Sequence, residues 1–262
     1  MYAFEIERPA TVAAAVAALG HEGAQALGGG QTLIPSLKQR LASPAVLVSL
    51  TGIAEMKGVC MSDDGLLCIG AATPHAVVAA EARARYPALA HLAGHIGDPA
   101  VRNRGTIGGS LANNDPAACW PAGVLGSGAT VVTSNRRIAA DDFFHGMFST
   151  ALEDGEIITE VRFPIPQKAA YVKFVQPASR FALTGVFVAK FAGGVRVAVT
   201  GASETGVFRW SAAEAALSAD FSAHAVEGLA VAADSMIGDL HGTPAYRAHL
   251  VKVMTKRAVT AA

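Results

Sequence analysis

The chain has 262 residues, of which 52% are hydrophobic and 16% charged. This composition is apolar enough to bury a large core and excludes an intrinsically disordered protein. The 21 basic and 21 acidic residues give a formal net charge of zero, which disfavours nucleic acid as a partner. No apolar stretch approaches the roughly 20 residues of a membrane-spanning helix. The acidic start MYAFEIERPA does not resemble an export signal, so we expect a cytoplasmic protein without a membrane span.

The cysteines are odd in number and none has CxxC spacing; they are Cys60, Cys68 and Cys119. This pattern disfavours a disulfide framework and a zinc site. Because an iron–sulfur cluster usually needs four thiolates, the chain alone cannot supply a typical one.

The first fifty residues alternate between helix-forming and strand-forming segments around a run of glycines. Proline and glycine mark the ends of the helices, and short apolar runs predict buried strands. In order we expect a helix, a short strand, a glycine loop, a helix and a strand, over residues 11–19, 24–27, 28–30, 32–41 and 45–50.

The next hundred residues begin with a hairpin, in which 58–62 and 66–71 flank the turn Asp63-Asp64-Gly65. Thr73-Pro74 opens a further helix, and 87–96 predicts another. Residues 97–115 contain so many glycine, proline and asparagine residues that we expect an ordered loop. Three strands are predicted after this loop, over residues 129–134, 137–139 and 157–163.

Pro164-Ile165-Pro166 predicts a linker between two parts of the chain. Beyond it we expect antiparallel strands at 171–175, 183–191 and 195–202, and helices at 212–217 and 243–259.

Gly28-Gly29-Gly30-Gln31-Thr32 lies between a predicted strand and a predicted helix. Glycines let backbone N–H groups turn toward a bound anion, and a threonine hydroxyl adds a donor. A plain tight turn explains the same residues, and the loop fits neither the Rossmann nor the P-loop pattern.

A second glycine-rich segment, VRNRGTIGGSLANNDP, covers residues 101–116. Glycines, hydroxyls and amides gather here beside Arg102 and Arg104, and long loops inside compact domains are usually functional. Two separate loops of this kind suit a diphosphate held from both sides. Each arginine fits a phosphate contact, a partner contact or a solvated face.

Two segments resemble the signature loops of the FAD-binding medium subunits of molybdenum hydroxylases: GGGQTLIPSLKQRL and VRNRGTIGGSLANNDPAA. This family includes carbon monoxide dehydrogenase, and the middle domain of xanthine dehydrogenase is similar. Later segments resemble the family's C-terminal domain: YVKF with PASRFA, and GTPAYRAHL with KRA. The resemblance therefore covers nearly the whole chain.

The resemblance implies an α+β fold, the FAD-binding fold of vanillyl-alcohol oxidase. The expected domains are a FAD-binding domain of residues 1–165, with FAD between subdomains of about 1–55 and 56–165, and a C-terminal α+β domain of residues 168–262. It assigns the diphosphate to the two loops, and Lys173 to the flavin or its phosphates. Phe181 stands where relatives often carry a tyrosine near the isoalloxazine ring. The residues assigned to FAD are Gly28, Gly29, Gly30, Gln31, Thr32, Leu33, Thr106, Ile107, Gly108, Gly109, Ser110, Asn114, Asp115, Lys173 and Phe181.

One position departs from the family pattern. The aspartate that often follows the second loop and contacts the adenosine part of FAD is replaced by Cys119. Asp115 is a candidate substitute for that contact.

The resemblance also implies a division of labour among subunits. A molybdopterin large subunit would oxidise the substrate, and 2Fe–2S clusters on a small subunit would pass electrons to FAD in this chain. FAD would reduce an external acceptor, within a dimer of heterotrimers. No side chain of this chain need act as an acid, base or nucleophile. The alternatives are a self-contained flavin oxidase and a non-catalytic assembly subunit.

Other polar and aromatic residues have simpler explanations. His91 and His95 have the spacing of metal ligands on a helix, but no third ligand is evident. The acid pairs Asp141-Asp142 and Glu153-Asp154 suit turns, and Trp120 and Trp210 suit packing; the sequence therefore predicts no metal site.

Overall fold

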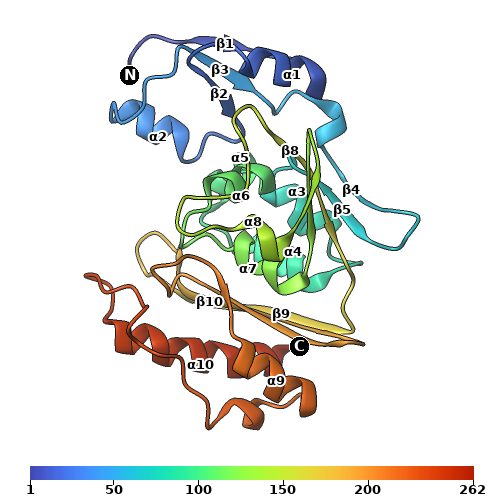
Figure 1. Ribbon diagram of the computed structural model, residues 1–262, viewed down its shortest axis with the longest axis vertical. Helices are drawn as coiled ribbons and strands as arrows, with labels where there is room; N and C mark the ends of the chain where they lie inside the picture. The colour runs from blue at the N-terminus through green and yellow to red at the C-terminus, as the bar shows by residue number, and fades with distance from the viewer.

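Three β-sheets lie one below another along the long axis of the molecule, as the computed structural model of residues 1–262 shows (Figure 1). Helices fill the layers between and outside these sheets. None of the helices combines the length and the apolarity needed to cross a bilayer.

The first sheet is parallel, with the strand order β1-β3-β2. Helix α1 packs on it through Ala15 and Ala18, and the Thr11 side chain caps this helix by accepting a hydrogen bond from the Ala14 amide. Helix α2 follows β2 directly after the glycine run. The elements are β1 (Glu5–Glu7), α1 (Val12–Leu19), β2 (Ala24–Leu27), α2 (Leu33–Lys38) and β3 (Val46–Ser49).

The second sheet is antiparallel, with the order β4-β5-β8-β6-β7, and its helices lie before β4, between β5 and β6, and after β7. The hairpin of β4 and β5 turns where Asp63-Asp64-Gly65 predicts. The strands are β4 (Val59–Met61), β5 (Leu67–Gly70), β6 (Thr130–Thr133), β7 (Arg137–Ala139) and β8 (Ile158–Phe163). The helices are η1 (Ala54–Met56), α3 (His75–Glu81), α4 (Pro87–Gly94), α5 (Pro99–Arg104), α6 (Ile107–Asn113), α7 (Trp120–Ser127) and α8 (Ala140–Phe143).

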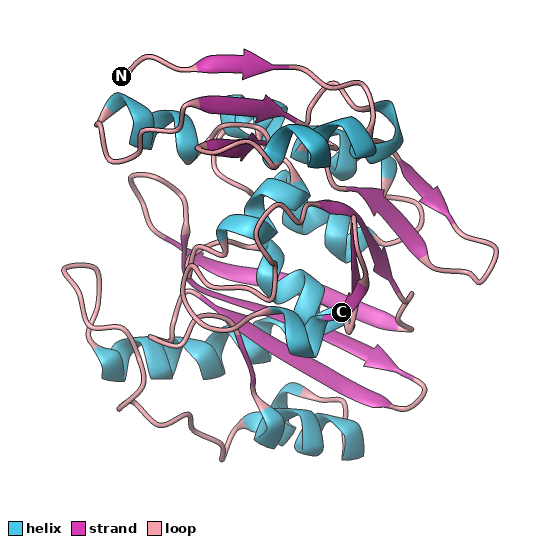
Figure 2. Ribbon diagram, turned by 45° about the horizontal axis from the view of Figure 1, so that its top comes forward, coloured by secondary structure: helices cyan, strands magenta, loops and turns pink.

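The third sheet is antiparallel, with the order β12-β11-β10-β9, and has helices on both faces (Figure 2). Helices α9 and α10 cover one face, while α4 and α7 contact the other. Val186 and Val188 of β10 therefore pack toward α10, whereas Phe187 packs into the core shared with the second sheet. The elements are β9 (Lys168–Val175), β10 (Ala182–Phe191), β11 (Gly194–Thr200), β12 (Phe208–Arg209), α9 (Ser211–Ala219), η2 (Ala223–Val226) and α10 (Pro244–Ala261).

The expectation of a loop over residues 97–115 is wrong, because α5 and α6 occupy most of it. Asp98 caps α5 with Pro99 in its first turn, and Thr106 caps α6 by accepting a hydrogen bond from the Gly109 amide. Gly108 lies within α6, and packing requires a glycine at this position, since a Cβ there would lie 2.7 Å from the Ala71 Cβ. The sequence also gave no indication of β1, α7 or α8.

Candidate functional site

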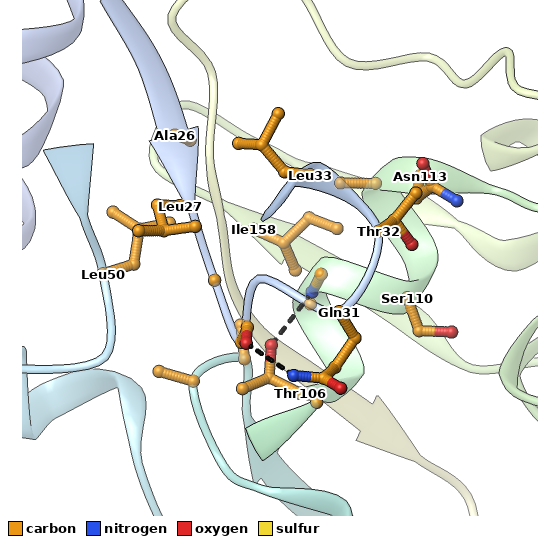
Figure 3. Close-up of a pocket in the computed structure, with 18 of the residues that line it drawn as sticks. Ala26, Leu27, Gln31, Thr32, Leu33, Leu50, Thr106, Ser110, Asn113 and Ile158 are labelled. Atoms are coloured by element: carbon orange, nitrogen blue, oxygen red, sulfur yellow. Dashed lines mark hydrogen bonds between the residues drawn. The ribbon is translucent and has the colours of Figure 1, made fainter. Parts of the chain in front are cut away.

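A cavity of about 470 Å³ lies between the β2–α2 loop, helix α6 and the end of β5 (Figure 3). Its volume is within the usual range of small-molecule sites, about 300–1,000 Å³. Both glycine segments predicted to bind a ligand line it, although they lie far apart in the sequence. The predicted site residues that line it are Gly28, Gly29, Gly30, Gln31, Thr32, Leu33, Thr106, Gly108, Gly109, Ser110 and Asp115.

The first loop presents a row of unpaired backbone donors. The N–H groups of residues 28–33 donate no hydrogen bond to any backbone or side-chain atom of the protein. Gly30 has a φ of +74°, in the left-handed region that favours glycine, and the Gln31 side-chain amide donates to the Gly29 carbonyl at 3.1 Å. Successive free N–H groups in a turn form an anion-binding concavity, so this loop can hold a phosphate.

The second loop is the first turn of α6, and it lies directly on the end of β5. The Gly108 amide donates to the Ala71 carbonyl at 2.9 Å, which fixes the helix against the strand. The Thr106 hydroxyl accepts from the Gly109 amide at 3.2 Å, a bond visible in Figure 3. Ile107 points away from the cavity, since it is fully buried in the core and does not line the site.

The two loops contact each other as well as the cavity. A Cβ placed on Gly29 would lie 2.0 Å from the Arg104 carbonyl oxygen and 2.7 Å from the Gly105 Cα. Gly29 is therefore required by loop–loop packing, which the sequence pattern did not indicate. Because the loops pack against each other, movement of one displaces the donors of the other.

Several residues assigned by resemblance lie outside the cavity lining. Asn114, a left-handed residue with a φ of +42°, donates its amide to the carbonyls of Gly146 and Ser149 and so supports a neighbouring loop. Phe181 packs edge-to-face on His241, with ring centroids 5.5 Å apart. Neither side chain lines the cavity.

Lys173, on β9, also lies outside the cavity lining. Its ammonium donates to the carbonyls of His95 at 2.7 Å and Arg180 at 2.8 Å, and it lies 3.7 Å from the Cys119 sulfur. These three contacts use all three donors of the ammonium group. Lys173 thus joins the end of α4, the start of α7 and the β9–β10 turn.

Cys119 is buried at the start of α7, and the neighbouring Ala118 lines the cavity while Cys119 does not. Asp115 does line it, and its carboxylate accepts a hydrogen bond from the Ala117 amide at 2.8 Å. The position to which the resemblance assigns an aspartate is therefore occupied by a cysteine that packs against Lys173.

Two buried titratable residues of the cavity wall were missed by the sequence analysis, because their partners are distant in the chain. Burial lowers the pKa of His75 to about 4, so its ring is neutral at neutral pH. Burial alone would raise the pKa of Glu156, but hydrogen bonds from Arg136 and Thr133 outweigh it and lower the pKa to about 2. The other wall residues missed are mostly apolar: Ala26, Leu27, Leu50, Met56, Ala71, Ala72, Ile96, Leu152, Ile157 and Ile158.

The remaining candidates are explained by structural contacts. His91 and His95 stack with ring centroids 4.0 Å apart, and nowhere do three or more histidine, cysteine or acidic side chains gather as a metal site would require. Asp141 pairs with Arg196 and Arg209. Packing roles for both tryptophans are confirmed by their burial, with Trp120 fully buried and Trp210 6% exposed.

The cavity thus has unpaired N–H groups at its loops and an apolar wall beside them, which suits an anionic ligand with a large apolar part. Residues 2–166 match the family described as the FAD binding domain in molybdopterin dehydrogenase. The chain is 34% identical to the carbon monoxide dehydrogenase medium chain of Hydrogenophaga pseudoflava, over 99% of this chain and 96% of that protein. It is 32% identical to the glyceraldehyde dehydrogenase medium chain of Sulfolobus acidocaldarius, over 91% and 90% of the two chains.

A solved structure of carbon monoxide dehydrogenase from Hydrogenophaga pseudoflava, which lacks the Mo-pyranopterin moiety of the molybdenum cofactor, matches the fold with a TM-score of 0.89. That match has 35% sequence identity and covers 100% of this chain and 97% of the other. The α+β fold expected from the sequence is therefore confirmed. The chain belongs to the FAD-binding medium subunits of the molybdenum hydroxylase family and is a component of an oxidoreductase.

Proposed function

We propose that the chain holds FAD in this cavity. The bound FAD would receive electrons from 2Fe–2S clusters on a partner subunit. The assignment of FAD rests on the unpaired N–H groups of residues 28–33. These residues line the same cavity as Thr106 and Ser110 of the second loop. FAD fits them because its diphosphate needs donors on more than one side and its ring system needs an apolar wall. Bound FAD would supply the chemistry of accepting electrons and passing them to an external acceptor.

The residues of the chain bind and orient the cofactor in this proposal. The two loops hold the diphosphate, and apolar residues such as Leu27, Leu50 and Ile158 shield the cofactor from water. Lys173 acts indirectly, because its ammonium is already bound to two carbonyls and secures Cys119 beside the cavity. We also propose that Phe181 and Asn114 act from outside the cavity lining and make no direct contact with the diphosphate. Asn114 acts through the loop that it supports.

The proposed partners are an iron–sulfur small subunit and a molybdopterin large subunit, arranged as a cytoplasmic dimer of heterotrimers. The proposed domains of this chain are residues 1–165 and 168–262, with subdomains of about 1–55 and 56–165. The relatives named above are medium chains, which supports a multi-subunit assembly.

A self-contained flavin oxidase would need a free base beside the flavin. Glu156 is held by Arg136, with a pKa of about 2, while Asp115 is bound to the Ala117 amide. No observation favours this alternative. A non-catalytic assembly role would be favoured by loss of the diphosphate loops, but both are present.

The test is the flavin content of the purified chain and the reduction of its flavin in the assembled complex. We expect flavin absorbance bands that bleach when substrate is added anaerobically to the complex. The same substrate added to the isolated, FAD-loaded chain should leave the bands unchanged. No flavin bands after incubation with FAD would exclude FAD binding, and bleaching in the isolated chain would favour the oxidase instead.

A further inference from the structure

His75 has one defined tautomer in the cavity wall. The indole N–H of Trp120 donates to its Nδ1 at 3.1 Å, across 45 positions of sequence. Because an indole N–H can only donate, Nδ1 must be unprotonated, and the proton of the neutral ring lies on Nε2. Since burial lowers the pKa of His75 to about 4, this neutral tautomer is the one present at neutral pH.

The Nε2 donor of His75 lacks a partner within the protein, although the residue is only 4% exposed. Nε2 itself is not fully enclosed, and His75 lines the cavity, so a ligand or water in the cavity can reach this nitrogen and accept its hydrogen. Gly105 lies next to this nitrogen, since a Cβ on Gly105 would be 2.8 Å from Nε2. Both residues line the cavity, and Gly105 directly precedes Thr106 of the second loop.

The backbone fixes the ring in this place. The His75 amide donates to the Gly105 carbonyl at 2.9 Å, and Pro74 and Thr106 form an isolated antiparallel bridge. The first residue of α3 is therefore attached to the start of α6. A ligand held by the second loop lies on the side of the cavity that His75 shares.

We propose that His75 is a further cofactor-binding residue, which donates its Nε2 hydrogen to an acceptor oxygen of the bound nucleotide. The inference rests on the proposed binding of FAD in this cavity. The acceptor is an oxygen of the diphosphate or of the ribityl–flavin part. Because the ring is neutral, it donates one hydrogen bond in a defined direction and adds no positive charge to the site. Trp120 is a positioning residue, because its hydrogen bond to Nδ1 fixes the tautomer.

The test compares FAD dissociation constants of the wild-type chain, His75→Phe and His75→Gln, measured by flavin fluorescence after removal of bound FAD. Loss of one hydrogen bond is expected to raise the constant about tenfold in His75→Phe. Glutamine places an amide donor near the Nε2 position, so His75→Gln should remain within about threefold of wild type. His91→Phe is the matched control and should not change the constant, because His91 does not line the cavity.

Ring N–H resonances of 15N-histidine-labelled wild-type chain provide a readout that does not depend on a substitution. Addition of FAD should shift one slowly exchanging Nε2–H resonance, which is absent from His75→Gln. Displacement of FAD by ADP locates the acceptor: weaker ADP binding in His75→Phe assigns it to the diphosphate, and unchanged ADP binding assigns it to the ribityl–flavin part.

An Nε2–H resonance that FAD does not shift, or a folded His75→Phe that binds FAD within twofold of wild type, would overturn the role of His75 while leaving FAD binding intact. If His75→Phe fails to fold, the wild-type resonance decides. Failure of the wild-type chain to bind FAD would instead refute the proposed function.

Discussion

Replacing Gly29 by alanine tests whether the two loops are packed against each other. The added methyl would lie 2.0 Å from the Arg104 carbonyl oxygen, so the loops must separate by about 1.4 Å to reach an ordinary contact of 3.4 Å. Overpacking of this kind costs about 1–3 kcal/mol. Alanine offsets about 0.4–1 kcal/mol by restricting the unfolded chain, since Gly29 is not in the left-handed region. We therefore expect a net loss of about 1–2 kcal/mol.

Thermal unfolding of the purified chain measures this loss, which corresponds to a fall in Tm of roughly 2–8 °C for a protein of this size. FAD affinity should fall by roughly tenfold or more, because donors from both loops move out of range of one ligand. Gly109→Ala is the matched control for stability: its Cβ would contact only Thr106 Oγ1, at 3.1 Å, and alanine favours the helix. If Gly29→Ala melts within 1 °C of wild type and binds FAD equally well, the packing argument is refuted.

Three further substitutions test His75 in the cavity wall, Asn114 after the second loop, and Arg247 of α10. Arg247 bridges separate segments, because it donates to the Leu183 and Gly201 carbonyls and pairs with Asp239. Since the pKa of His75 falls from 6.5 in the unfolded chain to about 4, the unfolded chain binds more protons between these values, and His75 costs about 3 kcal/mol of stability as pH drops through that window. His75→Phe should flatten the stability profile there, measured by urea unfolding. Asn114→Ala should cost about 2–3 kcal/mol, because the carbonyls of Gly146 and Ser149 lose the Asn114 amide as a donor and alanine is placed at a φ of +42°. Arg247→Met should cost about 3 kcal/mol, because a buried arginine paired with Asp239 and two carbonyls is removed.

Each of these has its own check. The Glu156 carboxylate, whose pKa is about 2, should still cause loss of stability below about pH 4.5 in the His75 variant, so only the upper window changes. A wild-type slope retained between pH 4 and 6.5 would contradict the His75 assignment. Asn114→Gly relieves the backbone strain but not the lost hydrogen bonds, and should fall between Asn114→Ala and wild type. A cost below 1 kcal/mol for Arg247→Met would contradict its bridging role.

Much of the fold could be predicted from local signals. The helices predicted to begin at Thr11 and Thr243 do begin there, with these threonines as their caps, and the Asp63-Asp64-Gly65 turn joins two paired strands. These features depend on residues within a few positions of one another. The strand Glu5–Glu7 could not be predicted, because its residues are exposed and it is a strand only through pairing with β3.

One glycine of each loop shows what could not be predicted from the sequence alone. Gly108 was interpreted as a sign of a loop, but it lies in a helix where contact with Ala71 leaves no space for a side chain. Gly29 was interpreted as part of an anion-binding turn, and its close neighbour is the Arg104 backbone. The identity of a glycine is local information, whereas the neighbour that requires it is more than thirty residues away.

The sequence by itself determined the two loops, their order and the family to which the chain belongs. Only the tertiary structure showed that residues 28–33 keep their N–H groups unpaired and that Lys173 is already bound to His95 and Arg180. It also brought Trp120 to His75, which fixes a neutral donor in the cavity wall. Such features depend on burial and on hydrogen bonds between distant segments, and these exist only once the chain has packed.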